Sequence, residues 1–219
     1  MYAGFDFGIL AANAPFLWNG MLLTLELTAL AVSGGMLLGA VLAVARLSPV
    51  QPLAWAVEGY VNFLRSMPLI LVIFWFYTLV PKAIGRPVSG FYSVLIAFVM
   101  FEAAYYSEII RAGISSVRRG QSAAALALGL TKLQAMRYVV LPQAVRNMIP
   151  VLLTQSIIML QDTSLVYVVG LRDFLTSADI VASRDNRPTE LYLFVAFVFL
   201  IVCFSASRLA NRLRRRYAL

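Results

Sequence analysis

The chain has 219 residues, of which 61% are apolar and 13% charged, and its formal net charge is +8. Soluble domains carry about 25% charged residues, so this composition excludes an ordinary soluble domain and indicates a polytopic membrane protein. The chain has no His and a single Cys, Cys203, which excludes an internal disulfide and removes the commonest metal ligand. We therefore expect no metal site and no cofactor bound by this chain.

Five segments are apolar and long enough to cross a hydrocarbon core of ~30 Å, which takes about 20 helical residues. We predict one all-α transmembrane domain, residues 1–219, with spans at about 17–45, 57–80, 91–112, 148–169 and 191–209. Pro68 is expected to kink the second span because it removes a backbone hydrogen bond. Gly35 and Gly39 lie four residues apart, so they can form a packing notch for another helix. A polar loop is expected from Arg172 to Glu190.

The distribution of basic residues predicts an orientation. With the N-terminus outside and the C-terminus cytoplasmic, thirteen Lys or Arg residues fall on the inner side, Arg214, Arg215 and Arg216 among them, and five on the outer side. Short cytoplasmic loops are enriched in Lys and Arg. This asymmetry accounts for the net positive charge, so we expect the lipid bilayer and no nucleic acid as a partner.

The segment Ser122–Pro142 is a helical, moderately polar island between strongly apolar regions. Its alanines and leucines favour a short helix with small side chains that can lie in a partner's groove. Gly129 allows the chain to turn where that helix ends. The alternative interpretation is an ordinary amphipathic interfacial helix. The spacing within the island is Ala123, Ala124 and Ala125, three residues, Gly129, nine residues, Val139, one residue, then Leu141 and Pro142.

This spacing resembles the EAA motif of ABC-importer permeases, which reads Glu-Ala-Ala, three residues, Gly, nine residues, Ile, one residue, Leu-Pro. Ala123 stands in place of the motif's Glu, and Val139 in place of its Ile. The runs at residues 63–69, 101–114 and 160–166 are similar to those of polar-amino-acid permeases, and most of all to the smaller permease of glutamate/aspartate importers.

The resemblance implies a permease of the bacterial inner (cytoplasmic) membrane that imports polar amino acids, namely glutamate, aspartate or their amides, by alternating access. It places a cytoplasmic coupling helix between spans 3 and 4, in a coupling loop at residues 115–142. The implied partners are a homologous permease, forming a heterodimer, two ATPase subunits and an extracytoplasmic solute-binding protein. ATP and Mg²⁺ are expected on the ATPase, since Lys82 and Lys132 follow Pro81 and Thr131 and form no Walker A Gly-Lys pair. No catalytic residue is therefore expected here.

Polar groups within the predicted spans are candidates for substrate contact, because a charge there costs about 2.5 to 3.5 kcal/mol. The Asp162 carboxylate can hold an α-ammonium group, or it can belong to a structural network with Glu102 or Arg111. Glu108 is expected to pair with Arg111, three residues away. Arg111 and Arg65 can bind a substrate carboxylate or reach lipid phosphates. The full candidate set is Asp162, Thr163, Ser164, Gln155, Gln161, Tyr105, Glu102, Glu108, Arg111 and Arg65.

Two other classes of protein were weighed. A self-contained ion-coupled carrier or channel would use Glu102, Glu108 and Asp162 and would transport without ATP. An intramembrane enzyme is disfavoured because the chain has no His and because Cys203 lies in an apolar run, where a thiolate is unfavourable.

Overall fold

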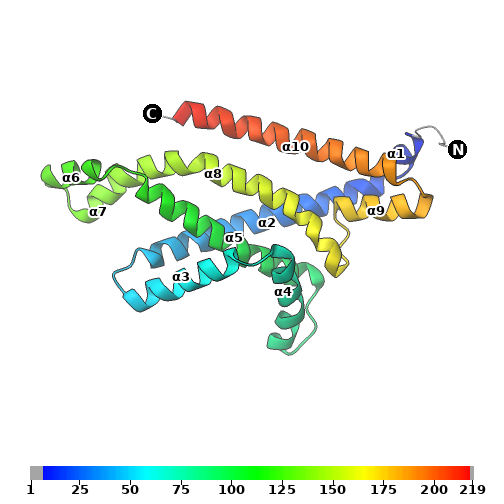
Figure 1. Cartoon of the computed structure of the whole chain (residues 1–219), viewed down its shortest axis with the longest axis horizontal. Coiled ribbons are helices and arrows are strands. Elements are labelled where there is room, and N and C mark those ends of the chain that lie inside the picture. Colours follow the sequence, from blue (N-terminus) through cyan, green and yellow to red (C-terminus); the bar gives the residue numbers. More distant parts are fainter. Residues whose placement is uncertain (1–6, 218–219) are drawn as a thin grey trace.

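In the computed structural model the backbone is described for residues 7–217 and the side chains for residues 7–213, and all regular structure in this range is helical (Figure 1). The elements in chain order are α1 (Gly8–Ala12), α2 (Ala14–Arg46), α3 (Gln51–Arg65), α4 (Leu69–Ile84), α5 (Gly90–Ser115), α6 (Arg119–Ala127), α7 (Lys132–Ala135), the π-helix η1 (Met136–Val140), α8 (Leu141–Asp162), the 3₁₀-helix η2 (Thr163–Val169), α9 (Phe174–Asp185) and α10 (Pro188–Tyr217). The side chains of Arg214, Arg215 and Arg216 lie outside the described residues.

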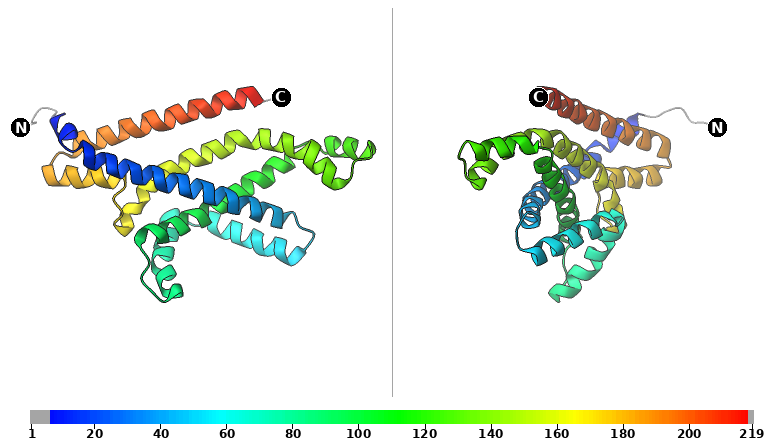
Figure 2. Two further views of the ribbon diagram at one scale, coloured as in Figure 1. Left: turned by 180° about the vertical axis from the view of Figure 1, so that it is seen from behind. Right: turned by 60° about the vertical axis from the view of Figure 1, so that its left-hand side comes forward.

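Four helical segments are long and apolar enough to cross a membrane, and α3 with α4 makes a fifth if the bent pair counts as one span. The four are α2, α5, the continuous run Lys132–Val169 and α10 as far as Leu213. The short helices α1 and α9 lie at one end of the molecule, and α6 and α7 lie at the other (Figure 2). Helix α1 begins at one end of the molecule, and α10 runs from that end toward the other (Figure 2).

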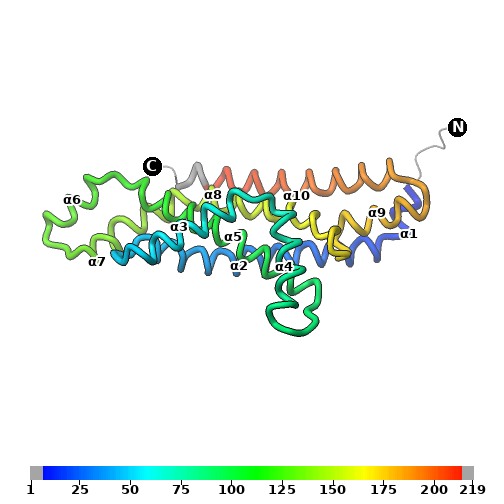
Figure 3. The backbone as a smooth tube through the Cα atoms, turned by 60° about the horizontal axis from the view of Figure 1, so that its bottom comes forward, coloured from blue at the N-terminus to red at the C-terminus, as the bar shows by residue number. Residues whose placement is uncertain are grey.

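The predicted second span, residues 57–80, is broken and not merely kinked. Helix α3 ends at Arg65, α4 begins at Leu69, and their axes differ by 111°. Pro68 has an extended backbone (φ −61°, ψ 132°), lacks an N–H group and disfavours helix in the residue before it. Helix α4 consequently projects from the side of the bundle, away from α10 (Figure 3).

The helix that contains the predicted fourth span, residues 148–169, begins before that span. Helix α8 starts at Leu141 and continues η1 without a break, so the predicted coupling loop 115–142 ends inside a helix. Pro142 lacks a backbone donor, and the wider π turn directly before it accommodates the missing hydrogen bond. The final residues of the span, Thr163–Val169, form a 3₁₀-helix.

The polar loop predicted between Arg172 and Glu190 contains the helix α9, so that expectation was wrong. Asp173 caps this helix, because its carboxylate accepts hydrogen bonds from the backbone N–H groups of Thr176 (3.0 Å) and Leu175 (3.2 Å). Burial raises the pKa of the Asp173 carboxyl, and the hydrogen bonds from Thr176 oppose that shift. The apolar residues of α9, Phe174 among them, pack in a core with residues of α2 and α10.

Helix α5 packs against the notch that Gly35 and Gly39 form on α2. A Cβ atom added at Gly35 would lie 2.6 Å from the Cβ of Glu102, and one added at Gly39 would lie 2.7 Å from the Cβ of Tyr106. Contacts of this kind leave no room for a methyl group, so the two glycines allow α5 to approach the backbone of α2. The predicted packing notch is confirmed, and it fixes the positions of Glu102 and Tyr106.

Candidate functional site

Glu102 is fully buried between α2, α5 and α8. Its Oε1 atom accepts a hydrogen bond from Nε2 of Gln155 on α8 (3.0 Å), and its Oε2 atom has no hydrogen-bond partner within the part of the chain that the structure describes. One turn further along α5, the Tyr106 hydroxyl lies 3.1 Å from the Ser156 hydroxyl of α8. These two polar contacts join the third and fourth predicted spans through Gln155 and Ser156, and neither involves Asp162, for which the sequence left a structural network as the alternative.

Asp162 lies at the end of α8, where the helix changes to the 3₁₀-helix η2. Helix α8 packs against α5, and the Asp162 side chain is partly exposed. Among residues 7–213 no hydrogen bond or ion pair to its partly exposed carboxylate is found. Asp162 is thus a carboxylate available to a cation from outside the described chain.

The polar neighbours of Asp162 are largely engaged elsewhere. The Thr163 hydroxyl donates to the Leu160 carbonyl (2.7 Å), and the Ser164 hydroxyl donates to the Gln161 carbonyl (2.8 Å). The Gln161 amide donates to the sulfur of Cys203 on α10 (3.6 Å), so it faces away from α5. The hydroxyl of the partly exposed Ser164 can therefore accept a hydrogen bond from a ligand but has already used its donor, whereas Thr163 is fully buried.

Arg65 faces the same surface of α5 from the break between α3 and α4. Its guanidinium carbon lies 5.4 Å from the centre of the Tyr105 ring. This is within the range of a cation–π interaction. Arg65, on α3, contacts Tyr105 and pairs with Glu108. Both of these residues lie within α5 and not at its end. A cation from α3 therefore lies beside Tyr105 on the surface of α5.

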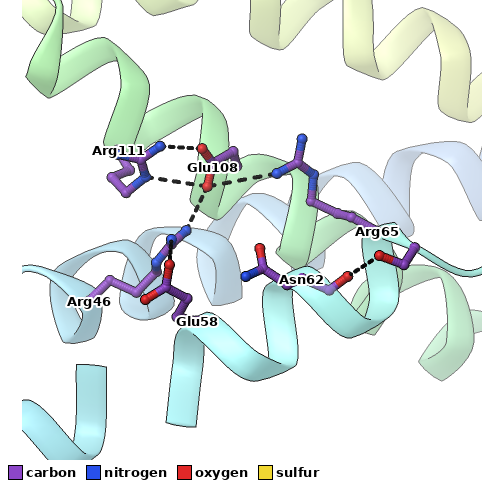
Figure 4. A network of polar contacts seen from close by, with 7 residues as sticks. Arg46, Glu58, Asn62, Arg65, Glu108 and Arg111 are labelled. Carbon is purple, nitrogen blue, oxygen red and sulfur yellow. Dashed lines mark hydrogen bonds and ion pairs between the residues drawn. The ribbon is translucent and has the colours of Figure 1, made fainter. Parts of the chain in front are cut away.

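Glu108 is the centre of a cluster of three arginines (Figure 4). Its carboxylate pairs with Arg111, as the sequence spacing predicted, with Arg46 at the end of α2 (2.6 Å) and with Arg65 (3.8 Å). Arg46 also reaches Glu58 on α3 (3.5 Å). We call these residues, Arg46, Glu58, Arg65, Glu108 and Arg111, the arginine–glutamate cluster.

The arginine–glutamate cluster ties together α2, α3 and α5. Three arginines face two carboxylates, so it carries one positive charge in excess. Arg46 and Glu58 were not among the predicted site residues. Arg46 lies 62 positions from Glu108 in the sequence, and no local spacing signals such a contact. Arg111 is engaged by Glu108 and is thereby less available to a substrate than Arg65.

The predicted substrate residues therefore fall into two groups. The side chains of Glu102, Gln155 and Thr163 are buried, and the first two join α5 to α8. The remainder are at least partly accessible, and among them Arg65 and Tyr105 are in contact.

The segment around Gly129 forms a compact hairpin. Helix α6 ends in a Schellman motif, in which the N–H of Leu130 donates to the Ala125 carbonyl (3.2 Å) and the N–H of Gly129 to the Leu126 carbonyl (3.0 Å). Gly129 has φ +85°, a left-handed conformation that side chains disfavour. Thr131 then starts α7 through a capping box with Gln134.

This hairpin, residues 119–140, presents small and apolar side chains to its surroundings. Ala123 and Ala124 are exposed, whereas Ala125 is buried within the hairpin and cannot be presented to a partner. Leu128 and Leu133 are 84% and 78% exposed. Val139 is partly buried, and Leu141 and Pro142 are exposed where α8 begins.

Known proteins resemble this chain over nearly its whole length. A family described as the binding-protein-dependent transport system inner membrane component matches residues 35–219. The glutamate/aspartate import permease protein GltK of Escherichia coli O157:H7 is 48% identical, over 98% of this chain and 99% of GltK. The probable glutamine ABC transporter permease protein GlnM of Bacillus subtilis is 36% identical, over 95% of this chain and 96% of GlnM.

Solved structures show the same fold. A chain from an amino acid ABC transporter with histidines superposes with a TM-score of 0.91 at 34% identity, covering 98% of this chain and all of the other. A chain of the methionine ABC transporter MetNI, in an inward-facing conformation, gives a TM-score of 0.79 at 18% identity, over 95% of this chain and 99% of the other, so that likeness concerns the fold alone. The family match covers most of the sequence, and the chain belongs to the inner membrane components of binding-protein-dependent transport systems.

Proposed function

We propose that the chain is the permease subunit of an ATP-driven importer of acidic amino acids, glutamate and aspartate, or of their amides. The observation that carries this proposal is the 48% identity to a glutamate/aspartate import permease over almost the full length of both chains. Likeness at this level, over 98% of this chain and 99% of the relative, supports a shared architecture and a related substrate.

The energy source in this proposal is a separate ATPase that binds the hairpin of α6 and α7. The exposed Leu128 and Leu133 support this role, because large exposed apolar side chains at the end of a helical bundle favour a protein partner. The same end carries Lys132 and Arg137, which supports a cytoplasmic location and the predicted orientation with the N-terminus outside. A homologous permease completes the pore, a heterodimer being the expected form, and an extracytoplasmic binding protein delivers the amino acid in the bacterial inner membrane.

The surface around Tyr105 is the proposed substrate contact. Arg65 would bind a substrate carboxylate, and Asp162, which has no partner among the described side chains, would bind the α-ammonium group. Glu102 and Gln155 would act as positioning residues, since they are buried and fix α5 against α8. The excess positive charge of the neighbouring arginine–glutamate cluster would favour an anionic substrate over a cationic one.

Alternating access requires the helices around this surface to move relative to one another. The arginine–glutamate cluster joins α2, α3 and α5, whereas Asp162 belongs to α8, which is continuous with the hairpin. Closure of the ATPase dimer would therefore displace α8, breaking or sliding the contacts of Gln155 and Ser156 with α5, and would leave the other three helices held together. That displacement would open and close the space between Asp162 and Arg65.

Reconstitution in lipid vesicles tests this function. The chain, its homologous permease and its ATPase are inserted together, and uptake of labelled glutamate is measured with the binding protein on one face and ATP on the other. Uptake that requires ATP and is stimulated by the loaded binding protein is the expected result. Uptake by the chain without ATP would instead support an ion-coupled carrier and refute the proposal.

The same vesicles test the substrate contact. Asp162→Asn keeps the shape of the side chain but removes its charge, and loss of a charge-assisted hydrogen bond of about 1.5–3 kcal/mol should lower the apparent affinity for glutamate roughly tenfold or more. Gln161→Glu is the matched control, because this neighbouring side chain faces α10. Equal effects of the two substitutions would remove Asp162 from the proposed site.

A further inference from the structure

A polar pocket lies at the base of the α6–α7 hairpin, between the start of α6 and the first turns of α8. Its volume is about 440 Å³. We call it the arginine pocket, and it is lined by Ser116, Val117, Arg118, Gln121, Gln143, Arg146 and Asn147.

The polar groups of the arginine pocket are not equally available to a ligand. Asn147 donates to the Ser116 hydroxyl (2.9 Å), which donates to the Gly113 carbonyl (2.7 Å), so these two side chains are mutually engaged. Arg118 and Arg146 are exposed and make no ion pair with any side chain of residues 7–213. The strongest unused hydrogen-bond donors in the pocket are therefore two guanidinium groups, which bind carboxylates with paired N–H···O bonds.

The sequence around the pocket supplies no carboxylate. Residues 109–161 contain six Lys or Arg residues and neither Asp nor Glu, and Ala123 occupies the position where the EAA motif has its only acidic residue. All the charged side chains on the docking face of this chain are therefore positive, so a complementary partner surface is acidic.

The lining also discriminates against a lipid as the occupant. Six of the seven lining residues are polar or charged, and Val117 is the single apolar one, so the pocket offers no groove for an acyl chain. We infer that the arginine pocket binds an Asp or Glu side chain of the ATPase, held between Arg118 and Arg146. This inference rests on the proposed function, and it assigns to the permease the basic side of a charge pair with its ATPase.

The test uses the assembled pair of permeases in lipid nanodiscs and measures the affinity of the purified ATPase at two salt concentrations. The double variant Arg118→Gln/Arg146→Gln is expected to weaken binding by about tenfold or more and to flatten its dependence on salt. The matched control Arg208→Gln/Arg212→Gln removes the same charge from α10, outside both the hairpin and the arginine pocket, and it is expected to change the affinity by less than about threefold. Arg118→Lys/Arg146→Lys keeps the charge and should retain more affinity than the glutamine pair.

Each outcome decides the inference. Equal losses of ATPase affinity in the pocket and control variants would show a general electrostatic attraction and overturn the inference. An unchanged affinity of the pocket variant would also overturn it. Loss of bound anionic phospholipid with an unchanged ATPase affinity would assign the pocket to a headgroup and overturn it too. If the unsubstituted permeases bind no ATPase, the proposed function fails as well. If they bind and the pocket variant binds equally, the inference fails alone. Recovery of binding by Arg146→Glu when one ATPase carboxylate is replaced by Lys would identify the bound residue.

Discussion

Gly39 leaves less room between α2 and α5 than a methyl group needs, so Gly39→Ala should destabilise the chain. The added Cβ would lie 2.7 Å from the Cβ of Tyr106, 3.0 Å from the Ala103 carbonyl oxygen and 3.0 Å from the Ser107 nitrogen. These atoms belong to the backbone or are bonded directly to it, so no side-chain rotation relieves the contact. The two helices must separate, and overpacking of this kind costs about 1–3 kcal/mol.

Gly59→Ala is the matched control. Gly59 lies within α3, and a Cβ added there meets nothing within 4 Å. Alanine in an open helical position should stabilise by about 0.5–1 kcal/mol, so the two identical substitutions are expected to act in opposite directions.

Thermal unfolding followed by tryptophan fluorescence, on the assembled permeases in one detergent, measures the difference. For a chain of this size 1 kcal/mol shifts Tm by roughly 2–4 °C, which gives a fall of roughly 2–12 °C for Gly39→Ala and a rise of roughly 1–4 °C for Gly59→Ala. A Gly39→Ala protein as stable as the Gly59→Ala protein would refute the close approach of α2 and α5 at the notch.

Two further substitutions test the polar contact and the hairpin. Gln155→Leu removes the donor to Glu102 and should cost about 1–3 kcal/mol in the same unfolding assay, and the double variant with Glu102→Leu should recover most of the loss. No recovery would contradict the direct pairing. Gly129→Val places a β-branched residue at φ +85°, which costs about 1–2 kcal/mol locally, so co-purification of the ATPase should fall while membrane insertion is unchanged. Gly120→Ala within α6 is its control, and equal retention of the ATPase by both proteins would count against the assigned role of the turn.

Hydropathy and single-residue signals predicted most of the helical framework. Long apolar runs identified α2, α5 and α10, since burial in lipid demands such runs whatever the packing. The close packing at Gly35 and Gly39 and the interruption of the helix at Pro68 both occur where the sequence predicted them. The angle at Pro68 could not be predicted, because proline interrupts a helix but the 111° between α3 and α4 depends on what each helix packs against.

Helix α9 was missed because its apolar residues are spaced among polar ones. Phe174, Ala178 and Val181 lie on one helical face behind the cap residue Asp173, and this periodicity was a usable signal. The arginine–glutamate cluster had no such signal, since Arg46 meets Glu108 only after α2 and α5 have packed. The polar residues around Tyr105 were identified one at a time, from the free-energy cost of placing a charge in a membrane. Their position next to Arg65 depends on the break after α3.

The run Lys132–Val169 has a mechanical consequence. Its 38 residues are helical without interruption, and at ~1.5 Å per residue such a rod is about 55–60 Å long, roughly twice the ~30 Å thickness of a hydrocarbon core. A helical run of that length exceeds the thickness of the membrane core. Under the proposed coupling to an ATPase, α7 and Asp162 would belong to one continuous element, so a movement of the hairpin outside the bilayer would displace Asp162 inside it.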